Sequence, residues 1–545
     1  MATVEASPPT SPRPAPPGEA SSLSPFRHPT FTVLWVATIV SNIGTWMQNA
    51  AAGWLMTGLD PDPFIVSLVQ VATSLPMFLF ALAGGALADI VDRRRLLIGI
   101  QTTVAALVAG FGLLVWLGQV TPIMLLAFSF LAGTAAALIA PAWMSIVPQL
   151  VPRENLQPAV ALNGVGLNVS RAIGPALAGL IIVSWGLAAP FWLNAFSTLG
   201  VIAALVWWQR PADDGAHRLP AERFGRAIRA GLRHARHNPH LRATLIRAAG
   251  FFIFASAYWA LLPLVARDQV AGGPRLYGLL LGAIGVGAVT GALTLPFAQR
   301  RFGPDAPAWA GTVGTAIAMV LYGLARQPST ALAASFVAGV SWIAVLSALN
   351  VSAQVGLPGW VRGRGLSIFS TVMFGGLTFG SALWGQVAAI TSLPIAHFAA
   401  AAGALLAVPL LWHWKLQTGA RVDFRPSMHW PEPMLSHDIA ADRGPVLVTI
   451  EYHINPADHG AFVNALLQLS QERRRNGAFE WGLFEDAGRE GRFLETFLLD
   501  SWMEHLRQHE RVTQADRARQ EAVHRFLLEG SPKVSHLIAS ERTGG

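Results

Sequence analysis

The sequence predicts an α-helical integral membrane protein with about twelve transmembrane helices in two parallel six-helix bundles, followed by a small cytoplasmic α+β ferredoxin-like domain. Three observations predict this fold class. The 545-residue chain is 52% hydrophobic and only 13% charged, whereas soluble domains carry about 25% charged residues. The apolar region contains an internal repeat, and the polar C-terminal region alternates strand and helix patterns.

The internal repeat divides the apolar region into two similar halves. Gly85–Leu87 returns as Gly291–Leu293, an offset of 206 residues, and the following Arg94–Arg95 returns as Arg300–Arg301. Parallel repeats of about six helices are typical of transporters whose halves move against each other. The same offset relates Phe130–Gly133 to Phe336–Gly339, Val151–Pro152 to Leu357–Pro358 and Gly174–Gly179 to Gly380–Gly385.

Apolar runs long enough to cross a bilayer, which takes about 20 residues, occur about twelve times. They predict a first bundle over 26–209 and a second over 244–418. The expected spans lie near 31–58, 65–88, 96–118, 121–147, 158–183, 187–208, 244–266, 276–298, 306–325, 329–351, 365–390 and 393–414.

The distribution of arginine predicts the orientation in the membrane. Arg93–Arg95, Arg153, Arg300–Arg301 and the segment 210–243 lie in loops on one side, and most opposite loops lack basic residues. An excess of Lys and Arg marks the cytoplasmic side. We therefore expect a multi-pass protein of the cytoplasmic (inner) membrane with both termini in the cytoplasm. Residues 1–25 are rich in Pro, Ser and Ala, which predicts a disordered lead and not a secretory signal.

The linker over 210–243 is expected to contain an amphipathic helix. Phe224, Ile228 and Leu232 form one apolar stripe on an arginine-rich segment, a pattern typical of helices at a membrane surface. The net charge of +8 is therefore assigned to topology and lipid contact, and no nucleic-acid partner is expected.

The tail is predicted to be a separate domain over 446–545, after a second linker over 419–445. Strands are expected near 445–454, 479–486, 492–500 and 534–539, and helices near 456–476 and 502–528. The resulting β-α-β-β-α-β order is the ferredoxin-like split unit. The tail resembles antibiotic-biosynthesis-monooxygenase-like domains, a likeness that implies dimerisation.

An enzymatic or metal-binding role of the tail is the alternative to a structural role. His505 and His509 have a spacing of i, i+4 that can bind a metal on a helix, but the sequence shows no third ligand, so we expect no metal site and no catalytic residues. A dimerisation or regulatory module is favoured over an enzyme acting on the transported compound. No cofactor is expected, because the sequence has no phosphate-binding Gly-x-x-x-x-Gly-Lys-Ser/Thr loop for ATP.

A loop motif connects the membrane region to a known family. Gly85-x-Leu87-Ala88-Asp89-x-x-Asp92-Arg93-Arg94-Arg95 resembles the signature of the major facilitator superfamily, with departures at Ile90 and Asp92. The resemblance implies that Gly85, Asp89, Arg93 and Arg94 lock the two bundles together in one state. Asp89 corresponds to Leu295 in the second half, so the lock would be asymmetric.

Two further segments narrow the resemblance. Gly166, Gly174, Pro175 and Gly179 resemble the small-residue and Gly-Pro pattern of superfamily exporters, although such spacing also serves ordinary tight packing. Pro141-Ala142, Val147–Glu154, Ala161–Asn163 and Arg171-x-x-Gly174-Pro175 resemble the enterobactin-exporter-like branch, also called transmembrane secretion effectors. The resemblance implies export of a small molecule, siderophore or drug-like, by alternating access.

Polar residues within the spans are the candidates for a substrate cavity. Arg171 lies half-way along the fifth span, where an unpaired cation costs about 3 kcal/mol or more. It is expected to hold an anionic group, to reach the cytoplasmic face or to be satisfied by carbonyl groups of neighbouring helices. At the repeat offset it corresponds to Leu377, which places the charges that gate or bind in the first half. Protons are a candidate coupling ion, although the spans offer few acidic groups. The candidates are Asn42, Gln48, Asn49, Gln70, Asn168, Arg171 and Asn350.

Overall fold

The membrane region consists of twelve helices that are long and apolar enough to cross a bilayer, as the sequence predicts. The computed structural model describes residues 22–208, 224–303, 305–358, 360–416, 427, 443–528 and 530–540, with the backbone alone for 82–90, 153, 224–230 and 510. The predicted lead over 1–25 and the second linker over 419–445 lie largely outside these ranges, as do residues 210–223 of the first linker.

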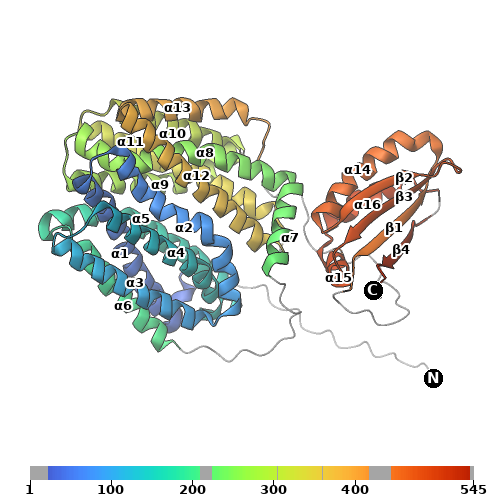
Figure 1. Ribbon diagram of the computed structural model, residues 1–545, viewed down its shortest axis with the longest axis horizontal. Helices are drawn as coiled ribbons and strands as arrows, with labels where there is room; N and C mark the ends of the chain where they lie inside the picture. The colour runs from blue at the N-terminus through green and yellow to red at the C-terminus, as the bar shows by residue number, and fades with distance from the viewer. Residues whose placement is uncertain are drawn as a thin grey trace, which may run out of the picture.

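The spanning helices form two bundles of six (Figure 1). The first bundle contains α1 (Pro29–Leu59), α2 (Pro63–Ile90), α3 (Arg93–Trp116), α4 (Pro122–Leu150), α5 (Leu156–Trp185) and α6 (Ala189–Trp207). The second contains α8 (Pro239–Leu264), α9 (Pro274–Phe302), α10 (Ala306–Leu324), α11 (Pro328–Val355), α12 (Arg362–Ile390) and α13 (Leu393–Leu410). A short π-helix, η3 (Val265–Gln269), extends α8.

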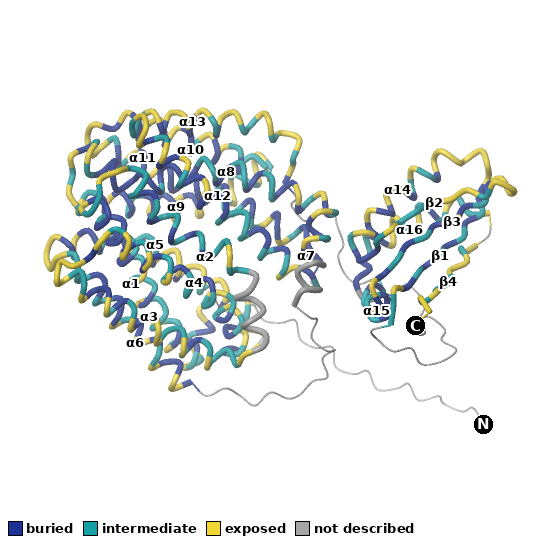
Figure 2. The backbone as a smooth tube through the Cα atoms, in the orientation of Figure 1, coloured by how far each residue is buried: buried dark blue, intermediate teal, exposed yellow. Residues whose placement is uncertain are grey.

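Proline and capping residues set where these helices begin. Nine of the twelve carry Pro at their first or second position, where the missing N–H costs no hydrogen bond. Asn238 accepts hydrogen bonds from the backbone of His240 and Leu241 and so starts α8. Large apolar side chains such as Trp116, Ile123 and Leu406 remain exposed on the bundle surface, which fits contact with lipid (Figure 2).

The tail contains a four-stranded antiparallel sheet in the order β2-β3-β1-β4. Residues of β1, including Val446 and Tyr452, pack against Phe462 and Leu466 of α14 in the core of the domain. The elements are β1 (Val446–His453), α14 (His459–Arg475), β2 (Phe479–Glu485), β3 (Arg492–Leu499), α15 (Trp502–Arg511), α16 (Gln514–His524) and β4 (Lys533–Ile538).

The single helix predicted over 502–528 is wrong. The chain leaves the helical conformation at Val512, and Thr513 starts a new helix through a capping box with Asp516. Because these side chains satisfy the backbone N–H groups at the start of α16, two short helices replace one long helix.

The amphipathic helix of the linker is α7 (Phe224–His237). It packs against α8 and α12 of the second bundle and also against α14 of the tail. Figure 1 shows α7 between the second bundle and the tail. The stripe residues Phe224 and Ile228 lie outside the described side chains, and Leu232 is exposed.

Candidate substrate pathway

The two bundles meet along two helix pairs, α2 with α12 and α5 with α9. We call the side at which α1 begins and α7 lies the terminal face, and the opposite side the far face. Ser67 in the first turns of α2 lies against Gly385 near the end of α12, at the far face. Near the middle, the Ser74 and Thr378 hydroxyls lie 2.8 Å apart, and the Phe78 and Phe379 rings pack edge to face.

The α5–α9 contact depends on glycine. A Cβ atom on Gly278 would lie 2.8 Å from the Gly179 Cα and 2.8 Å from the Pro175 carbonyl oxygen, distances that no real side chain tolerates. Further along, Gly285 of α9 lies directly against Ala172 of α5. The bundles are therefore in close contact from the far face to the middle of the membrane region.

The predicted packing motif on α5 divides between two partners. A Cβ on Gly174 would lie 2.6 Å from the Trp46 Cβ, and one on Gly166 would lie 2.7 Å from the Ile39 Cδ1, both on α1. Pro175 and Gly179 face α9 instead. One side of the motif holds the first bundle together, and the other joins the two bundles.

Arg171 lies in the middle of α5, next to the contact between Ala172 and Gly285. Its guanidinium carbon lies 5.1 Å from the centre of the Trp46 ring. Its Nε is buried and has no hydrogen-bond partner.

The other predicted cavity residues do not gather into one site. Gln48 is buried and accepts a 2.6 Å hydrogen bond from Asn194. Asn168 and Asn350 donate to carbonyl oxygens of their own helices. Asn42, Asn49 and Gln70 are partly buried. Gln48 therefore joins α1 to α6, and among these candidates Arg171 has the most unsatisfied hydrogen-bonding capacity.

The loop motif lies between α2 and α3. Gly85 and Asp89 fall in the last turns of α2, where side chains are outside the described part of the structure, so the predicted lock stays untested. Asp92 accepts a hydrogen bond from the Arg95 backbone and caps α3. Arg94 donates to the Leu205 and Val206 carbonyl oxygens, each at 2.7 Å, at the end of α6.

A buried charge that the sequence analysis did not single out occurs in the second bundle. The Arg247 Nη1 of α8 lies 2.5 Å from the Asp305 Oδ1, and Arg247 is only 5% exposed. Its guanidinium also stacks on Trp309 at 3.7 Å. An arginine inside the apolar run 244–266 was a signal in the sequence for this pair.

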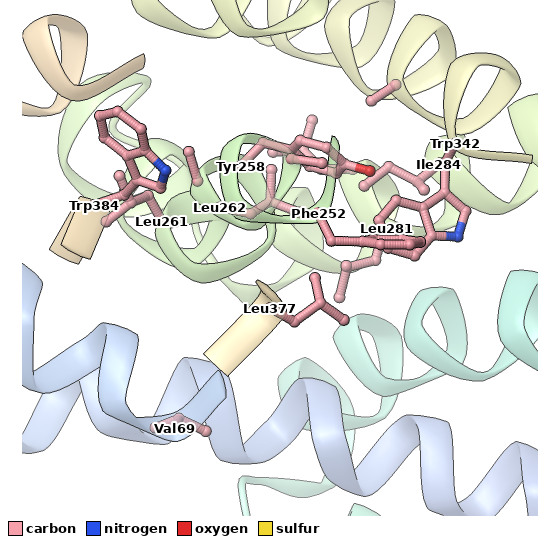
Figure 3. Packing of buried hydrophobic residues seen from close by; sticks show 14 of the residues in the cluster. Val69, Phe252, Tyr258, Leu261, Leu262, Leu281, Ile284, Trp342, Leu377 and Trp384 are labelled. Carbon is pink, nitrogen blue, oxygen red and sulfur yellow. The ribbon is translucent and has the colours of Figure 1, made fainter. Parts of the chain in front are cut away.

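Three aromatic residues of the second bundle were also missed. Tyr258 and Trp259 of α8 and Trp342 of α11 pack together, with ring centres 5.4 to 6.5 Å apart. Figure 3 shows Tyr258 and Trp342 beside Phe252 and Ile284. No local sequence pattern distinguishes these residues from ordinary core aromatics.

A buried histidine of the second bundle was missed as well. His397 of α13 is fully buried beside Tyr322, with its Nε2 unpartnered. Its ring lies inside the second bundle.

The tail buries several polar groups. Glu495 accepts hydrogen bonds from Tyr452 and Trp481 and pairs with Arg473. Burial raises the pKa of Glu472 to about 7. The ring centre of His505 lies 4.7 Å from that of His509 and 4.5 Å from that of His536. No group of three or more His, Asp or Glu side chains in the described part of the chain is arranged to hold a metal ion.

The tail is docked on the second bundle through α7 and the loop before α12. Arg233 of α7 pairs with Glu504 at 3.5 Å, and Glu504 pairs with Arg511 at 2.6 Å. His234 is buried at this junction, in edge contact with Trp360. Burial and the positive charge of Arg475 lower the pKa of His234 to about 3.

Comparisons with known proteins agree with this architecture. A family model described as transmembrane secretion effector matches residues 20–544. The enterobactin exporter EntS of Shigella boydii serotype 4 is 26% identical over 389 residues, covering 70% of this chain and 91% of the relative. The same exporter from Escherichia coli O1:K1 / APEC matches equally, at 26% over 389 residues.

Solved transporter structures share the fold. A bacterial homologue of the human lysosomal transporter Spinster superposes with a TM-score of 0.54 at 15% identity, covering 71% of this chain and 97% of the other. A POT family transporter in complex with 5-aminolevulinic acid has a TM-score of 0.58 at 11% identity, covering 70% and 95%.

Proposed function

Because the chain belongs to the transmembrane secretion effector family of major facilitator transporters, we propose that it exports a small siderophore or drug-like molecule across the cytoplasmic membrane. The two relatives named above are enterobactin exporters. We also propose that both termini lie in the cytoplasm, which the arginine-rich loops of the terminal face support.

The contact between the bundles is the observation that carries this proposal. The pairs α2–α12 and α5–α9 are closed from the far face to the middle of the membrane region. With the terminal face in the cytoplasm, this is the state in which the outward path is sealed and substrate enters from the cytoplasm. Rocking of the two bundles would then release substrate outside.

The loop motif is proposed to hold the bundles in the opposite state. Asp89, Arg93 and Arg94 lie at the terminal face, where the bundles would close after the far face opens. Gly85 lies in the same turns of α2. Because Arg94 is bonded to α6 in this state, its engagement in the lock would require it to leave those carbonyl groups.

The tail is proposed to be a cytoplasmic module that pairs with a second copy of itself. One face of its sheet is covered by α14, and the other carries the exposed side chains of Phe484, Leu494 and Leu537. The chain contains no cysteine, so Leu537→Cys offers a direct test. A disulfide-linked dimer in membranes supports pairing, whereas its absence under oxidising conditions contradicts it.

Inverted membrane vesicles test the direction and the coupling of transport. Accumulation of candidate siderophores and drugs in vesicles that contain the protein, above vesicles that lack it, supports export. Comparison with and without a pH gradient decides whether protons are the coupling ion. An impermeant maleimide that labels Trp116→Cys in intact spheroplasts, but not Leu23→Cys, confirms the orientation, and the reverse pattern overturns it.

A further inference from the structure

Five side chains from both bundles lie on α1, α5, α8 and α11, helices that pack against one another or against α9. Arg171 of α5 lies over Trp46 of α1, while Tyr258, Trp259 and Trp342 form an aromatic cluster in the second bundle. Contacts connect the two groups. Ala172, next to Arg171, lies against Gly285 of α9, and the neighbouring Ile284 lies against Gly339 of α11, one turn before Trp342.

Two buried polar atoms of this cluster have no hydrogen-bond partner, the Arg171 Nε and the Trp342 Nε1. The Tyr258 hydroxyl and the Trp259 side chain hydrogen-bond only within the cluster, to each other. Tyr258 is 0% and Trp342 7% exposed. Leaving a buried polar group unsatisfied costs about 1–3 kcal/mol each. Unsatisfied donors in both bundles indicate that something else satisfies them during the working cycle.

The polar groups of the cluster are of one chemical kind. Arginine and tryptophan nitrogens only donate hydrogen bonds, and the Tyr258 hydroxyl can donate as well. No acidic residue occurs in the sequence of α1, α5, α8 or α11. A molecule that satisfies this cluster must therefore supply the acceptors, and its charge must balance Arg171.

The surrounding rings set the second requirement. The flat faces of Trp46, Tyr258, Trp259 and Trp342 provide aromatic surface, and aromatic pairs are favourable by about 0.5–1.5 kcal/mol beyond the area that they bury. Resting on the proposed transport function, we propose that Arg171, Trp46, Tyr258, Trp259 and Trp342 form the substrate site and select an anionic aromatic molecule, with its oxyanion at Arg171 and its ring among the tryptophans.

Calorimetric titration of the purified full-length chain tests this assignment with three probes. 2-Naphthoate carries both a ring and a charge, 2-naphthalenemethanol the ring alone, and cyclohexanecarboxylate the charge alone. We expect naphthoate to bind at least tenfold more tightly than either of the others. Equal affinity for naphthoate and naphthalenemethanol would overturn the role of charge, and equal affinity for the two carboxylates would overturn the role of the ring.

Variants assign the affinity to the cluster. Arg171→Gln should weaken naphthoate binding at least tenfold without changing that of naphthalenemethanol, and Arg171→Lys should recover part of the loss. Trp342→Phe, which removes one donor and keeps a ring, should weaken naphthoate binding severalfold. Thr102→Val on the exposed face of α3 serves as the control. Unchanged affinity in Arg171→Gln, at an unchanged melting temperature, contradicts the proposal.

Two further outcomes separate this inference from the transport function. If chloride displaces naphthoate and binds with the same affinity as naphthoate, the site is a simple anion site. That result would overturn the proposal that the substrate is aromatic. Vesicle accumulation of another compound without any naphthoate binding would leave export standing and overturn the substrate class. Arg171-dependent naphthoate binding in a protein that moves no compound would support the site and contradict transport.

Discussion

The guanidinium carbon of Arg511 lies 4.3 Å from the centre of the Trp360 indole, so that a tail residue stacks on the loop directly before α12. Arg511 also pairs with Glu504, which reaches Arg233 of α7. These contacts join the tail to α7 and to the loop before α12, the helix that packs on α2 of the other bundle.

Arg511→Ala is expected to release the tail from the second bundle. The change removes a partly buried cation–π contact, which contributes about 1–2 kcal/mol, and leaves Glu504 without its closest partner. The ratio of molecules with a docked tail to molecules with an undocked tail should fall about tenfold or more. Spin labels at Leu537→Cys and Phe302→Cys measure the distance between tail and membrane region. Arg517→Ala, which breaks an exposed pair with Glu521, should leave that distance unchanged.

Gly278→Ala is expected to separate the bundles at the far face. The added Cβ meets the backbone of Gly179 and Pro175 at 2.8 Å, and overpacking of this kind costs about 1–3 kcal/mol. The equilibrium between the states closed and open at the far face should shift by roughly tenfold or more toward the open state. Spin labels at Trp116→Cys and Ile395→Cys detect the shift as a longer distance between the bundles. Gly164→Ala meets no atom within 4 Å, and an equal shift in that variant would contradict the explanation.

Removal of one partner of the Arg247–Asp305 pair should destabilise the second bundle. Arg247 is buried, and breaking a buried pair costs about 3–5 kcal/mol, reduced here because Asp305 is 25% exposed. We expect Asp305→Asn to lower the thermal stability in detergent, and Arg247→Met with Asp305→Leu to recover most of it. Asp268→Asn, in an exposed pair with Arg267, should change little.

Acid should destabilise the tail through His505. Burial, together with His536 and His509, lowers the pKa of His505 from 6.5 to about 3. Below pH 6.5 the unfolded chain binds a proton at this histidine and the folded tail does not. The free energy of unfolding is therefore unaffected above pH 6.5 and falls with the pH below it, by about 2 kcal/mol at pH 5. His505→Phe should reduce the loss between pH 7 and 5 by that amount, measured by thermal unfolding followed at a label on Leu537→Cys.

Glu472 acts in the opposite direction and supplies a second variant. Its pKa, raised to about 7 by burial, contributes stability that is fully present below pH 4.5 and lost as the pH rises through 7. Glu472→Gln should therefore enlarge the loss of stability on acidification. A smaller loss in this variant would show that Glu472 is charged throughout the range.

The helices of the membrane region could be predicted because hydropathy and length are local properties of the sequence. The break at Thr513 could also have been predicted, since Thr513-x-x-Asp516 is a capping box. The partners of the α5 glycines could not. Gly179 follows Gly174 by five positions, and at 3.6 residues per turn this spacing places the two glycines on different faces of the helix. The helix opposite each face is set by tertiary packing.

The site itself was only half predictable. Arg171 stood out because a cation within an apolar run is costly wherever the helix packs. Tyr258 and Trp342 did not stand out, because aromatic residues are common in helices, and the lack of a partner for the Trp342 Nε1 is known only after folding. The amides that looked most polar, such as Gln48, found partners within their own bundle.

The absence of acidic residues from α1, α5, α8 and α11 bears on what energises the cycle. If an anion crosses with only Arg171 as its fixed counter-charge, each complete transport cycle moves one negative charge across the bilayer, because Arg171 returns with the empty protein. A membrane potential that is negative inside favours the exit of one negative charge by about 2.3 kcal/mol per 100 mV, which corresponds to a concentration ratio of about fifty. The voltage of the cell would then expel the molecule, and no counter-transported proton would be required.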